Sequence, residues 1–381
     1  MINLNVHSSY EFLNSNIQID PLLYILKEDE QTSVAITDFN YMHGAYEFIE
    51  KAQKENIKPI IGLEIEIESN FENTNVVLYA KNLNGFHFLS KLSSRISYKQ
   101  IDTTPLSFLK DITDCIAILK DENGLDVFNE IKVPEEDKYV SHTLNHDTYK
   151  RAYISKSYYY KQSDAPVKTI LNAIQKNEKI DLDYLNESEG TSHVKLREDV
   201  KEFEGFLEVN KEIVSKCEMY TPKVEYTLPK FTNDSSEELL KEELQVALNK
   251  KIKDITSDYT NRLNKEYKTI VEMGYADYFL IVSDLVRYSK NNDIYVGPGR
   301  GSSGASLVAY LLDITDIDPI EYDLLFERFL NKERVTMPDI DIDFASVDRP
   351  KVLKYLQDKY GEMHVANILT YNNMTAKSAA R

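Results

Sequence analysis

The sequence predicts an α/β fold for the first part of the chain and a second, mainly helical domain after it. Three observations support this prediction. Strand-like and helix-like apolar patterns alternate over residues 2–67, and the composition changes near 225–235, where two prolines precede a polar cluster. Beyond that point most apolar residues recur with helical spacing. A chain of 381 residues is also long enough for two or three domains.

The strands expected in the first part are short apolar runs. They are residues 2–7, 33–38, 57–67, 75–80, 115–120 and 151–156. Helices are expected between the first three runs, at residues 20–30 and 44–56. A β-α-β-α-β order predicts a parallel sheet with helices outside it, either as an α/β barrel or as an open sheet.

The second part combines longer helical patterns with three extended runs. The expected helices are residues 235–251, 278–292, 303–314 and 352–361. The expected strands are residues 294–296, 333–344 and 366–371.

The bulk composition is that of a soluble globular protein. The chain is 42% hydrophobic, has a net charge of −18, and contains no run apolar enough for a membrane span. An acidic average argues weakly against nucleic acid as a partner, although a local positive cleft is compatible with it. The two cysteines, Cys115 and Cys217, form no metal-spaced motif, which favours a reducing cytoplasm and disfavours structural zinc.

A glycine-rich loop, VGPGRGSSGAS at 296–306, lies between an expected strand and an expected helix. Such a loop can direct backbone N–H groups and a helix N-terminus toward a phosphate. Arg300 and Ser302 add side-chain donors. A plain turn without a ligand is the alternative. The loop matches GxGxxG formally, but no strand ending in an acid follows it, and it lacks the lysine of a P-loop.

Three aspartates, Asp339, Asp341 and Asp343, alternate with isoleucines in VTMPDIDIDF. On a strand their carboxylates would share one face, where like charges repel. A solvated edge strand is one interpretation, and a calcium site is another, although the glycine and distal glutamate of an EF-hand are missing. The third is a carboxylate cluster for Mg²⁺, which together with a phosphate loop suits phosphoryl or nucleotidyl transfer.

These motifs carry a specific resemblance. The runs YFLIVSDLV, VGPGRGSSGASLVAYLLDITDIDPIEYDLLFERFLNKERVTMPDIDIDF and ILTYNNMTAKSAAR closely resemble the alpha subunit of bacterial DNA polymerase III, in its shorter form without a built-in exonuclease domain. The resemblance covers the whole chain and is strongest over 269–381. It implies a DNA-directed DNA polymerase that adds dNTPs to a primer 3′-hydroxyl with two Mg²⁺ ions.

The resemblance also implies roles for individual residues. Asp339 and Asp341 match catalytic, metal-binding aspartates, whereas the role of Asp343 stays open. Arg300, Gly301 and Ser302 match positions that hold the triphosphate. Arg328 and Arg334 are candidates for further phosphate contacts or, equally, for ion pairs with nearby acids.

The implied domain order has three parts. Residues 1–228 form a polymerase-and-histidinol-phosphatase (PHP) domain with a distorted β/α barrel. Residues 229–370 form the first segment of a nucleotidyltransferase-type, polymerase-beta-like α+β palm, and residues 371–381 begin a thumb. The run ends at Arg381 without a helix stop signal, which predicts a fragment. A third catalytic aspartate and the regions for the sliding clamp and clamp loader would then lie beyond it, and the fragment would not polymerise alone.

The metal site of the PHP domain looks degenerate. The family pattern begins His-x-His-x-His or Asp-x-His-x-His, where this chain has Asn3-Leu-Asn5-Val-His7. A later Asp-x-His aligns with Lys156-Ser-Tyr158, and a lysine ammonium has no lone pair for a metal. His7, Asp38 and Glu64 remain as ligands. We therefore expect no metal in this domain, Mg²⁺ in the palm, and primer-template DNA and dNTP as partners. The alternatives are a metal-dependent PHP phosphoesterase and a non-catalytic interaction protein.

Overall fold

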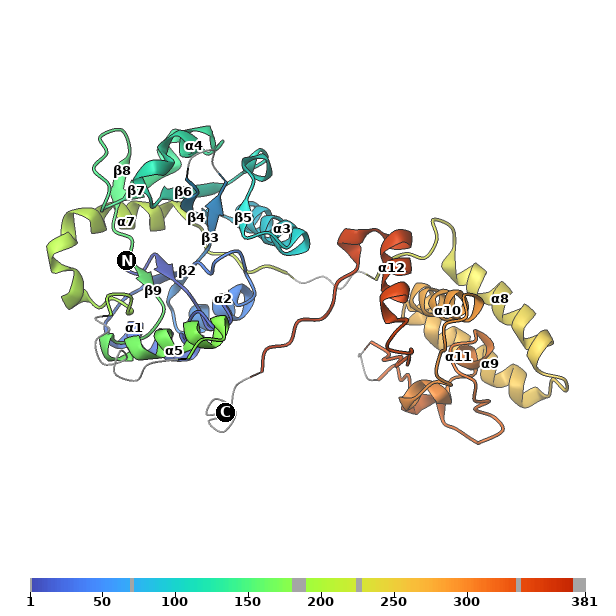
Figure 1. Cartoon of the computed structure of the whole chain (residues 1–381). Helices are drawn as coiled ribbons and strands as arrows, with labels where there is room; N and C mark the ends of the chain where they lie inside the picture. The colour runs from blue at the N-terminus through green and yellow to red at the C-terminus, as the bar shows by residue number, and fades with distance from the viewer. Residues whose placement is uncertain (1, 69–71, 180–189, 224–227, 334–336, 373–381) are drawn as a thin grey trace. The chain divides into compact units, whose positions relative to one another are not determined.

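The computed structural model describes residues 2–68, 72–179, 190–223, 228–333 and 337–372 (Figure 1). The chain divides into two compact units. The first comprises Met1–Lys223 and Tyr371–Arg381, and the second comprises Val224–Thr370. Tyr371 belongs to the first unit, and its hydroxyl donates to the carbonyl oxygen of Tyr10 at 3.0 Å. The functional names palm and thumb for parts of the chain stay predictions.

The first unit is built on one mixed sheet. Its strands are β1 (Asn5–Val6), β2 (Ser33–Ile36), β3 (Lys58–Ile67), β4 (Thr74–Ala80), β5 (Thr103–Thr104), β6 (Cys115–Leu119), β7 (Lys138–Ser141), β8 (Lys150–Ala152) and β9 (Lys156–Ser157). Their order is β8-β7-β6-β4-β3-β2-β1-β9, with β5 beside β3. β1, β2 and β3 pair in parallel, as predicted. β4 pairs antiparallel with both β3 and β6, which the expectation of a parallel sheet did not include.

Helices pack on both faces of this sheet (Figure 1). They are α1 (Ile19–Glu28), α2 (Ala45–Lys54), α3 (Leu83–Lys99), α4 (Leu125–Glu130), α5 (Ala165–Lys176) and α7 (Glu204–Lys216). Alternate residues of β3 enter different cores because successive side chains of a strand point to opposite faces. Ile61 packs with α1 and α2, whereas Ile60 packs with Ile213 of α7. The centre of the sheet is therefore buried on both sides, and polar side chains gather at the strand ends.

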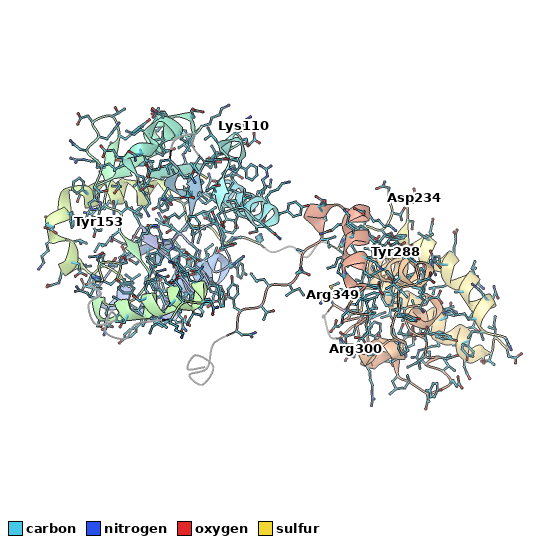
Figure 2. The ribbon with its side chains drawn as sticks, viewed as in Figure 1. Lys110, Tyr153, Asp234, Tyr288, Arg300 and Arg349 are labelled. Atoms are coloured by element: carbon cyan, nitrogen blue, oxygen red, sulfur yellow. The ribbon has the colours of Figure 1, made fainter. Side chains whose placement is uncertain are left out.

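The described part of the second unit is mainly helical. Its helices are α8 (Ser236–Lys251), α9 (Ser257–Glu272), α10 (Ala276–Asn291), α11 (Leu307–Leu311) and α12 (Arg349–Tyr360). The aliphatic and aromatic faces of α8 to α11 share one core with Phe326 and Phe329. Tyr288 of α10 stacks on Tyr355 of α12 with ring centroids 3.7 Å apart, and Figure 2 labels Tyr288 among the side chains of this unit. Within the described ranges, every helix is too short or too polar to span a bilayer.

The three strands expected in the second unit are corrected by the structure. Val296 pairs with Phe344, and Arg300 pairs with Asp341, in isolated antiparallel bridges. Residues 294–296 and 337–344 therefore form no continuous ladder. Residues 366–370 form no strand, and residues 334–336 lie outside the described ranges. A continuous ladder does not form because the segment that faces the aspartates is a poor strand former. Pro298 has no N–H group to donate, and a glycine stands on each side of this proline.

Candidate functional sites

The first candidate site lies at strand ends of the first unit. His7 follows β1, Asp38 follows the strand β2, and Glu64 lies in β3 beside Phe39. The sequence-predicted set does come together. His7 Nε2 lies 3.2 Å from Glu64 Oε2, and donor atoms of His7 and Asp38 belong to one group within 4.8 Å. All three side chains are buried.

Glu11 completes this group, and the sequence analysis missed it. Its Oε2 atom lies 2.5 Å from His7 Nδ1 and accepts the Phe39 N–H at 2.9 Å. Among the described residues, His7, Glu11 and Asp38 form the one group of three or more His, Cys, Asp or Glu side chains with donor atoms within 4.8 Å of one another. Glu11 follows β1 in an irregular loop, so no periodic pattern pointed to it.

Two lysines neutralise Glu64. Lys120 Nζ lies 3.0 Å from Glu64 Oε1 and 3.1 Å from Oε2, and it also donates to Asn5 Oδ1 at 2.9 Å. Lys156 Nζ lies 2.8 Å from Glu64 Oε1. The sequence predicts Lys156 at a former metal-ligand position, but it does not predict Lys120. The one feature of the sequence that could have pointed to Lys120 is its place as a charged residue directly after the apolar strand β6.

The two asparagines at the start of the domain have separate roles. Asn5 stays in the cluster and donates to Glu64 Oε2 and to Thr37 Oγ1, both at 2.8 Å. Asn3 takes no part in these contacts. It donates to Gln31 Oε1 at 3.1 Å and to the carbonyl oxygen of Lys195 at 2.8 Å. The first ligand position of the family pattern has therefore become a link between chain segments.

The charges of this cluster shift the pKa values of its members strongly. Burial lowers the pKa of His7, but the carboxylates of Glu11 and Glu64 outweigh it and raise that pKa to about 9. Burial, with the charge of Glu11, raises the pKa of Asp38 to about 7. Burial lowers the pKa of Lys120 to about 8 in spite of Glu64. Burial would raise the pKa of Glu64, yet the cations around it hold that pKa well below its ordinary value.

The second candidate site is the glycine loop of the second unit. Gly299 and Gly301 have φ values of 93° and 70°, in the left-handed region that favours glycine. A Cβ atom on Gly299 would lie 2.6 Å from Thr315 Cγ2, and one on Gly301 would lie 3.2 Å from Asp341 Oδ2. The predicted helix after the loop begins as a 3₁₀ turn, Gly301–Ala305, and continues as the five-residue α11.

The N-terminus of α11 is already occupied, which corrects the expectation that it would face a phosphate. Glu266 of α9 is fully buried and accepts the N–H groups of Leu307 and Val308, both at 3.0 Å. It also accepts the Ser306 hydroxyl at 2.9 Å and pairs with Arg262 Nε at 2.5 Å. Arg262 in turn donates to the carbonyl oxygens of Ala305 and Leu324. Glu266 and Arg262 therefore hold the C-terminal end of the glycine loop and the first residues of α11 in place. No sequence motif indicated this role.

The glycine loop and the aspartate segment lie next to each other. Arg300 and Asp341 form an antiparallel bridge, and Arg300 Nη2 lies 3.1 Å from Asp341 Oδ1. Arg300 Nε lies 3.2 Å from Asp343 Oδ1. Asp339 is exposed, and the two ion pairs of Arg300 go to the other two aspartates. The structure thus brings Asp341 to the loop and also assigns a contact to Asp343.

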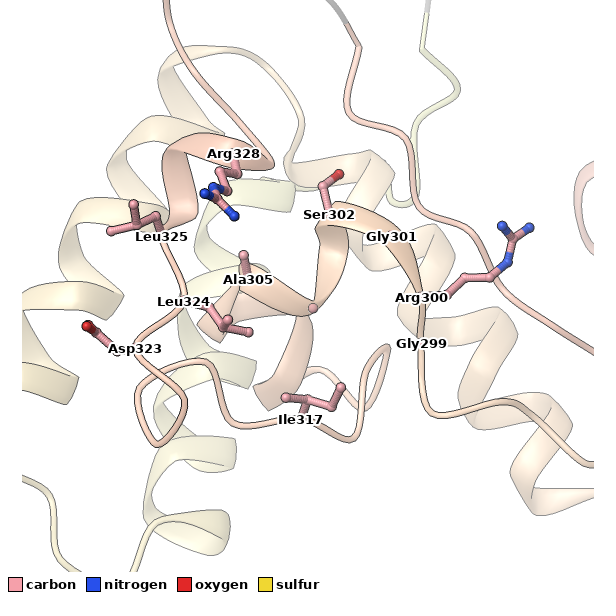
Figure 3. A pocket seen from close by; sticks show the side chains of 11 residues that line it. Gly299, Arg300, Gly301, Ser302, Ala305, Ile317, Asp323, Leu324, Leu325 and Arg328 are labelled. Atoms are coloured by element: carbon pink, nitrogen blue, oxygen red, sulfur yellow. The ribbon is translucent and has the colours of Figure 1, made fainter.

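A cavity of about 540 Å³ opens on the glycine loop (Figure 3). Ser302 and Arg328 are polar side chains of its lining, and Leu324, Leu325 and Ile317 are apolar ones. In Figure 3 the Arg300 side chain extends away from the rest of the lining. The predicted contact residue Arg328 thus lies at the same cavity as Ser302, whereas Arg334 lies outside the described residues.

Two protein families match this chain over overlapping ranges. Residues 3–279, more than half of the chain, match the PHP domain family, and the chain belongs to that family. Residues 236–381 match the bacterial DNA polymerase III alpha NTPase domain. The expected fold class, α/β with a PHP-type first domain, is therefore confirmed.

The chain is also similar to whole proteins of known name. The DNA polymerase III subunit alpha of Staphylococcus aureus strain COL is 38% identical over 99% of this chain and 36% of its own length. The same subunit of Staphylococcus epidermidis strain RP62A is 38% identical over 100% of this chain and 36% of its own length. The resemblance to this subunit is confirmed, and the chain spans about a third of the length of these relatives. A putative metal-dependent phosphoesterase from Bifidobacterium adolescentis aligns over 51% of this chain and 58% of its own at 11% identity, with a TM-score of 0.24 that carries no argument.

Proposed function

We propose that this chain is part of a replicative DNA polymerase alpha subunit and that its second unit carries part of the nucleotidyl-transfer site. The whole protein would join dNTPs to a primer 3′-hydroxyl under the direction of a template. The observation that carries the proposal is the contact between Arg300 and Asp341, at 3.1 Å. Phosphoryl transfer needs a phosphate-binding loop and metal-binding carboxylates at one place, and this contact joins the two motifs.

The carboxylates of this segment are of the kind that Mg²⁺ binds. Asp341 already neutralises a cationic group, and its side chain is 35% exposed, so that an ion and a triphosphate can reach it. Asp339 and Asp341 would hold Mg²⁺, which would supply Lewis-acid activation of the primer hydroxyl and would offset the charge of the triphosphate. Arg300, Gly301 and Ser302 would bind the triphosphate, through the guanidinium, the backbone N–H and the hydroxyl respectively.

The cavity supports a further contact to the same substrate. Ser302 and Arg328 both line it, so the cavity offers a neutral and a cationic donor to a phosphate, although Asp323 of the same lining opposes an anion. The partners of the whole protein would be primer-template DNA and dNTP. The sliding clamp and clamp loader would be bound through regions outside this chain, where the third catalytic aspartate would also lie. We infer that residues 1–381 do not polymerise alone, and that the whole protein works in the cytoplasm.

For the first unit we infer a structural module that works without metal. The observation in favour of the competing phosphoesterase is the group formed by His7, Glu11 and Asp38. Its donor atoms, however, already have partners. Asp38 Oδ1 accepts the Ser8 N–H at 2.5 Å and Oδ2 accepts the Ser8 hydroxyl at 2.6 Å. His7 contacts carboxylates through both ring nitrogens.

The charge balance of the cluster argues in the same direction. Glu11 and Glu64 face three cations, because His7 has a pKa of about 9 and both Lys120 and Lys156 reach Glu64. Asp38, with a pKa of about 7, is partly protonated near neutral pH. A divalent ion at Glu64 would have to displace an ammonium group, and one at His7 would have to displace a proton that Glu11 and Glu64 stabilise. The lysines therefore supply the positive charge that metal ions would otherwise supply.

Five measurements test these proposals. We expect the 381-residue chain to bind Mn²⁺ weakly in an EPR titration, and Asp341→Asn to remove that binding while Asp358→Asn, a matched exposed carboxylate, preserves it. Purified chain should contain no stoichiometric metal by elemental analysis, and EDTA should leave its melting temperature unchanged. Tightly held zinc or manganese would support the phosphoesterase instead.

For the whole protein, Asp341→Asn should abolish primer extension, and extension at normal rate would overturn the polymerase site. Clear incorporation by residues 1–381 alone would overturn the inference of inactivity.

A further inference from the structure

Asp343 fastens the aspartate segment to the glycine loop. Its carbonyl oxygen accepts the N–H of Gly297 at 2.9 Å, and the next residue, Phe344, forms a bridge with Val296. A Cβ atom on Gly297 would lie 3.1 Å from the Cβ atom of Asp343, so a side chain at Gly297 would crowd this approach. The backbone therefore places the Asp343 carboxylate directly at the loop that carries Arg300.

Arg300 uses two neighbouring nitrogen atoms of its guanidinium for the two carboxylates. Its Nε atom faces Asp343 Oδ1 at 3.2 Å, and its Nη2 atom faces Asp341 Oδ1 at 3.1 Å. A guanidinium is a rigid planar fork, so a carboxylate on Nε fixes the direction of both Nη groups. Those Nη groups form the edge that can bind a phosphate in a bidentate manner.

The two carboxylates are not equivalent in this arrangement. Asp341 also lies beside Gly301, whose missing Cβ would be 3.2 Å from its Oδ2 atom, so it stands inside the predicted triphosphate and metal site. Asp343 is more exposed, at 62% against 35%, and its contact goes to Nε rather than to an Nη group. A cation that binds the Asp341 carboxylate would free Nη2 of Arg300 and leave the contact between Nε and Asp343 in place.

We propose that Asp343 is a positioning residue, whose carboxylate holds the Nε edge of Arg300 so that its Nη groups are directed to a phosphate beside Asp341. This inference rests on the proposed function and gives a role to the third aspartate of the segment. It predicts that Asp343 affects the binding of a polyphosphate without being a ligand of the metal ion.

The test uses the 381-residue chain, inorganic tripolyphosphate with Mg²⁺, and three readouts. Calorimetry measures tripolyphosphate binding, EPR measures Mn²⁺ binding, and NMR follows the Nε–H signal of Arg300, assigned by its loss in Arg300→Lys. The variants are Asp343→Asn and the conservative Asp343→Glu. Asp358→Asn is the matched control, because Asp358 is 60% exposed and pairs with a lysine in the same unit.

We expect Asp343→Asn to shift the Nε–H signal and to weaken tripolyphosphate binding about fivefold, the effect of losing one exposed ion pair. Mn²⁺ affinity should change less than about twofold, because an exposed carboxylate that is not a ligand acts on the ion only through screened charge. Asp343→Glu should restore part of the binding, and Asp358→Asn should change none of the three readouts.

Three results would overturn the proposal. The first is an unshifted Nε–H signal in Asp343→Asn, which would mean that the contact does not form. The second is a shifted signal with unchanged tripolyphosphate binding, which would make the contact irrelevant to the phosphate. The third is a loss of Mn²⁺ affinity as large as that of Asp341→Asn, which would make Asp343 a metal ligand. If the unsubstituted chain binds neither Mn²⁺ nor tripolyphosphate, the proposed function fails separately, and the Nε–H signal decides the contact by itself.

Discussion

Replacing Lys120 with methionine tests whether ammonium groups hold the first unit together in place of metal. Glu64 is fully buried, and the Lys120 side chain is 12% exposed. Removing one partner of a buried ion pair costs about 3–5 kcal/mol, because a charge is left without compensation. Lys156 and His7 still face Glu64 in this variant, so we expect the lower end, about 3 kcal/mol.

This loss translates into a large change in melting temperature. One kcal/mol shifts the melting temperature of a unit of about 200 residues by about 2–4 °C, so Lys120→Met should melt about 6–12 °C lower. The chain has no tryptophan and two compact units, so the assay is calorimetry supported by circular dichroism, which resolves separate transitions. The control is Lys27→Met, which removes an exposed pair with Glu55 and should leave the melting temperature unchanged.

A double-mutant cycle separates the ion pair from the packing of the lysine stem. Glu64→Gln alone leaves the buried Lys120 without its main partner, and the combination with Lys120→Met removes both charges. The double variant should lose less stability than the sum of the single variants, by about 1–3 kcal/mol. Additive losses, or a Lys120→Met variant that melts within 2 °C of the unsubstituted chain, would refute the role of Lys120 as a built-in counter-ion.

Three further variants test other parts of the two sites. Asp38→Asn should be more stable than the unsubstituted chain, and its advantage should grow by about 2–3 kcal/mol between pH 5 and pH 8.5 in urea unfolding. The reason is that folding raises the Asp38 pKa from 3.8 to about 7. The contribution of the protonated Asp38 side chain to stability is therefore complete below pH 3.8 and is lost as the pH rises through 7. An advantage of Asp38→Asn that does not grow with pH would contradict this reasoning. Glu266→Ala should destabilise the second unit by about 3–5 kcal/mol in the same assay, since it strands buried donors, and a loss under 1 kcal/mol would show that water replaces the carboxylate. Gly299→Ala should lower the melting temperature, because φ at Gly299 is 93° and the added Cβ atom would meet Thr315. Gly304→Ala is the control and should leave the melting temperature unchanged, because no atom lies within 4 Å of its added Cβ atom. Equal effects of the two substitutions would argue against this loop geometry.

Much of the first unit could be predicted because its signals are local. Period-two runs and helical spacing gave β1 to β3 and the helices between them within a few residues. The antiparallel pairing of β3 and β4 was missed, although one signal was available. The expected strands 57–67 and 75–80 are separated by seven residues, and a parallel crossover needs a dozen or more. The pairing of β4 with β6 had no such signal, because a whole helix lies between them.

The sites were predictable to the extent that their residues follow strands or motifs. His7, Asp38 and Glu64 meet as expected, but Glu11 and Lys120 reach them only through the folded arrangement of separate loops and strands. In the second unit, residue types alone could not show that the N-terminus of α11 is capped by Glu266, about 40 positions earlier in the chain. Long-range contacts of this kind leave no periodic trace.

The two sites solve the same electrostatic problem in opposite ways. Each gathers carboxylates that would repel one another, and each contains cationic side chains that offset the repulsion. In the first unit the cations are His7 and Lys120, at 0% and 12% exposure, together with Lys156 beside the same carboxylate. In the second unit the cation is Arg300, at 58% exposure.

Burial decides what such a cation can do. A buried ammonium cannot leave without stranding its carboxylate at a cost of several kcal/mol, so it becomes a permanent part of the fold. An exposed guanidinium is held by about 1 kcal/mol or less and can exchange a carboxylate for a phosphate when another cation arrives. The same contrast predicts that Arg300→Gln should leave the melting temperature almost unchanged while weakening tripolyphosphate binding. Lys120→Met should lower the melting temperature and leave that binding unchanged.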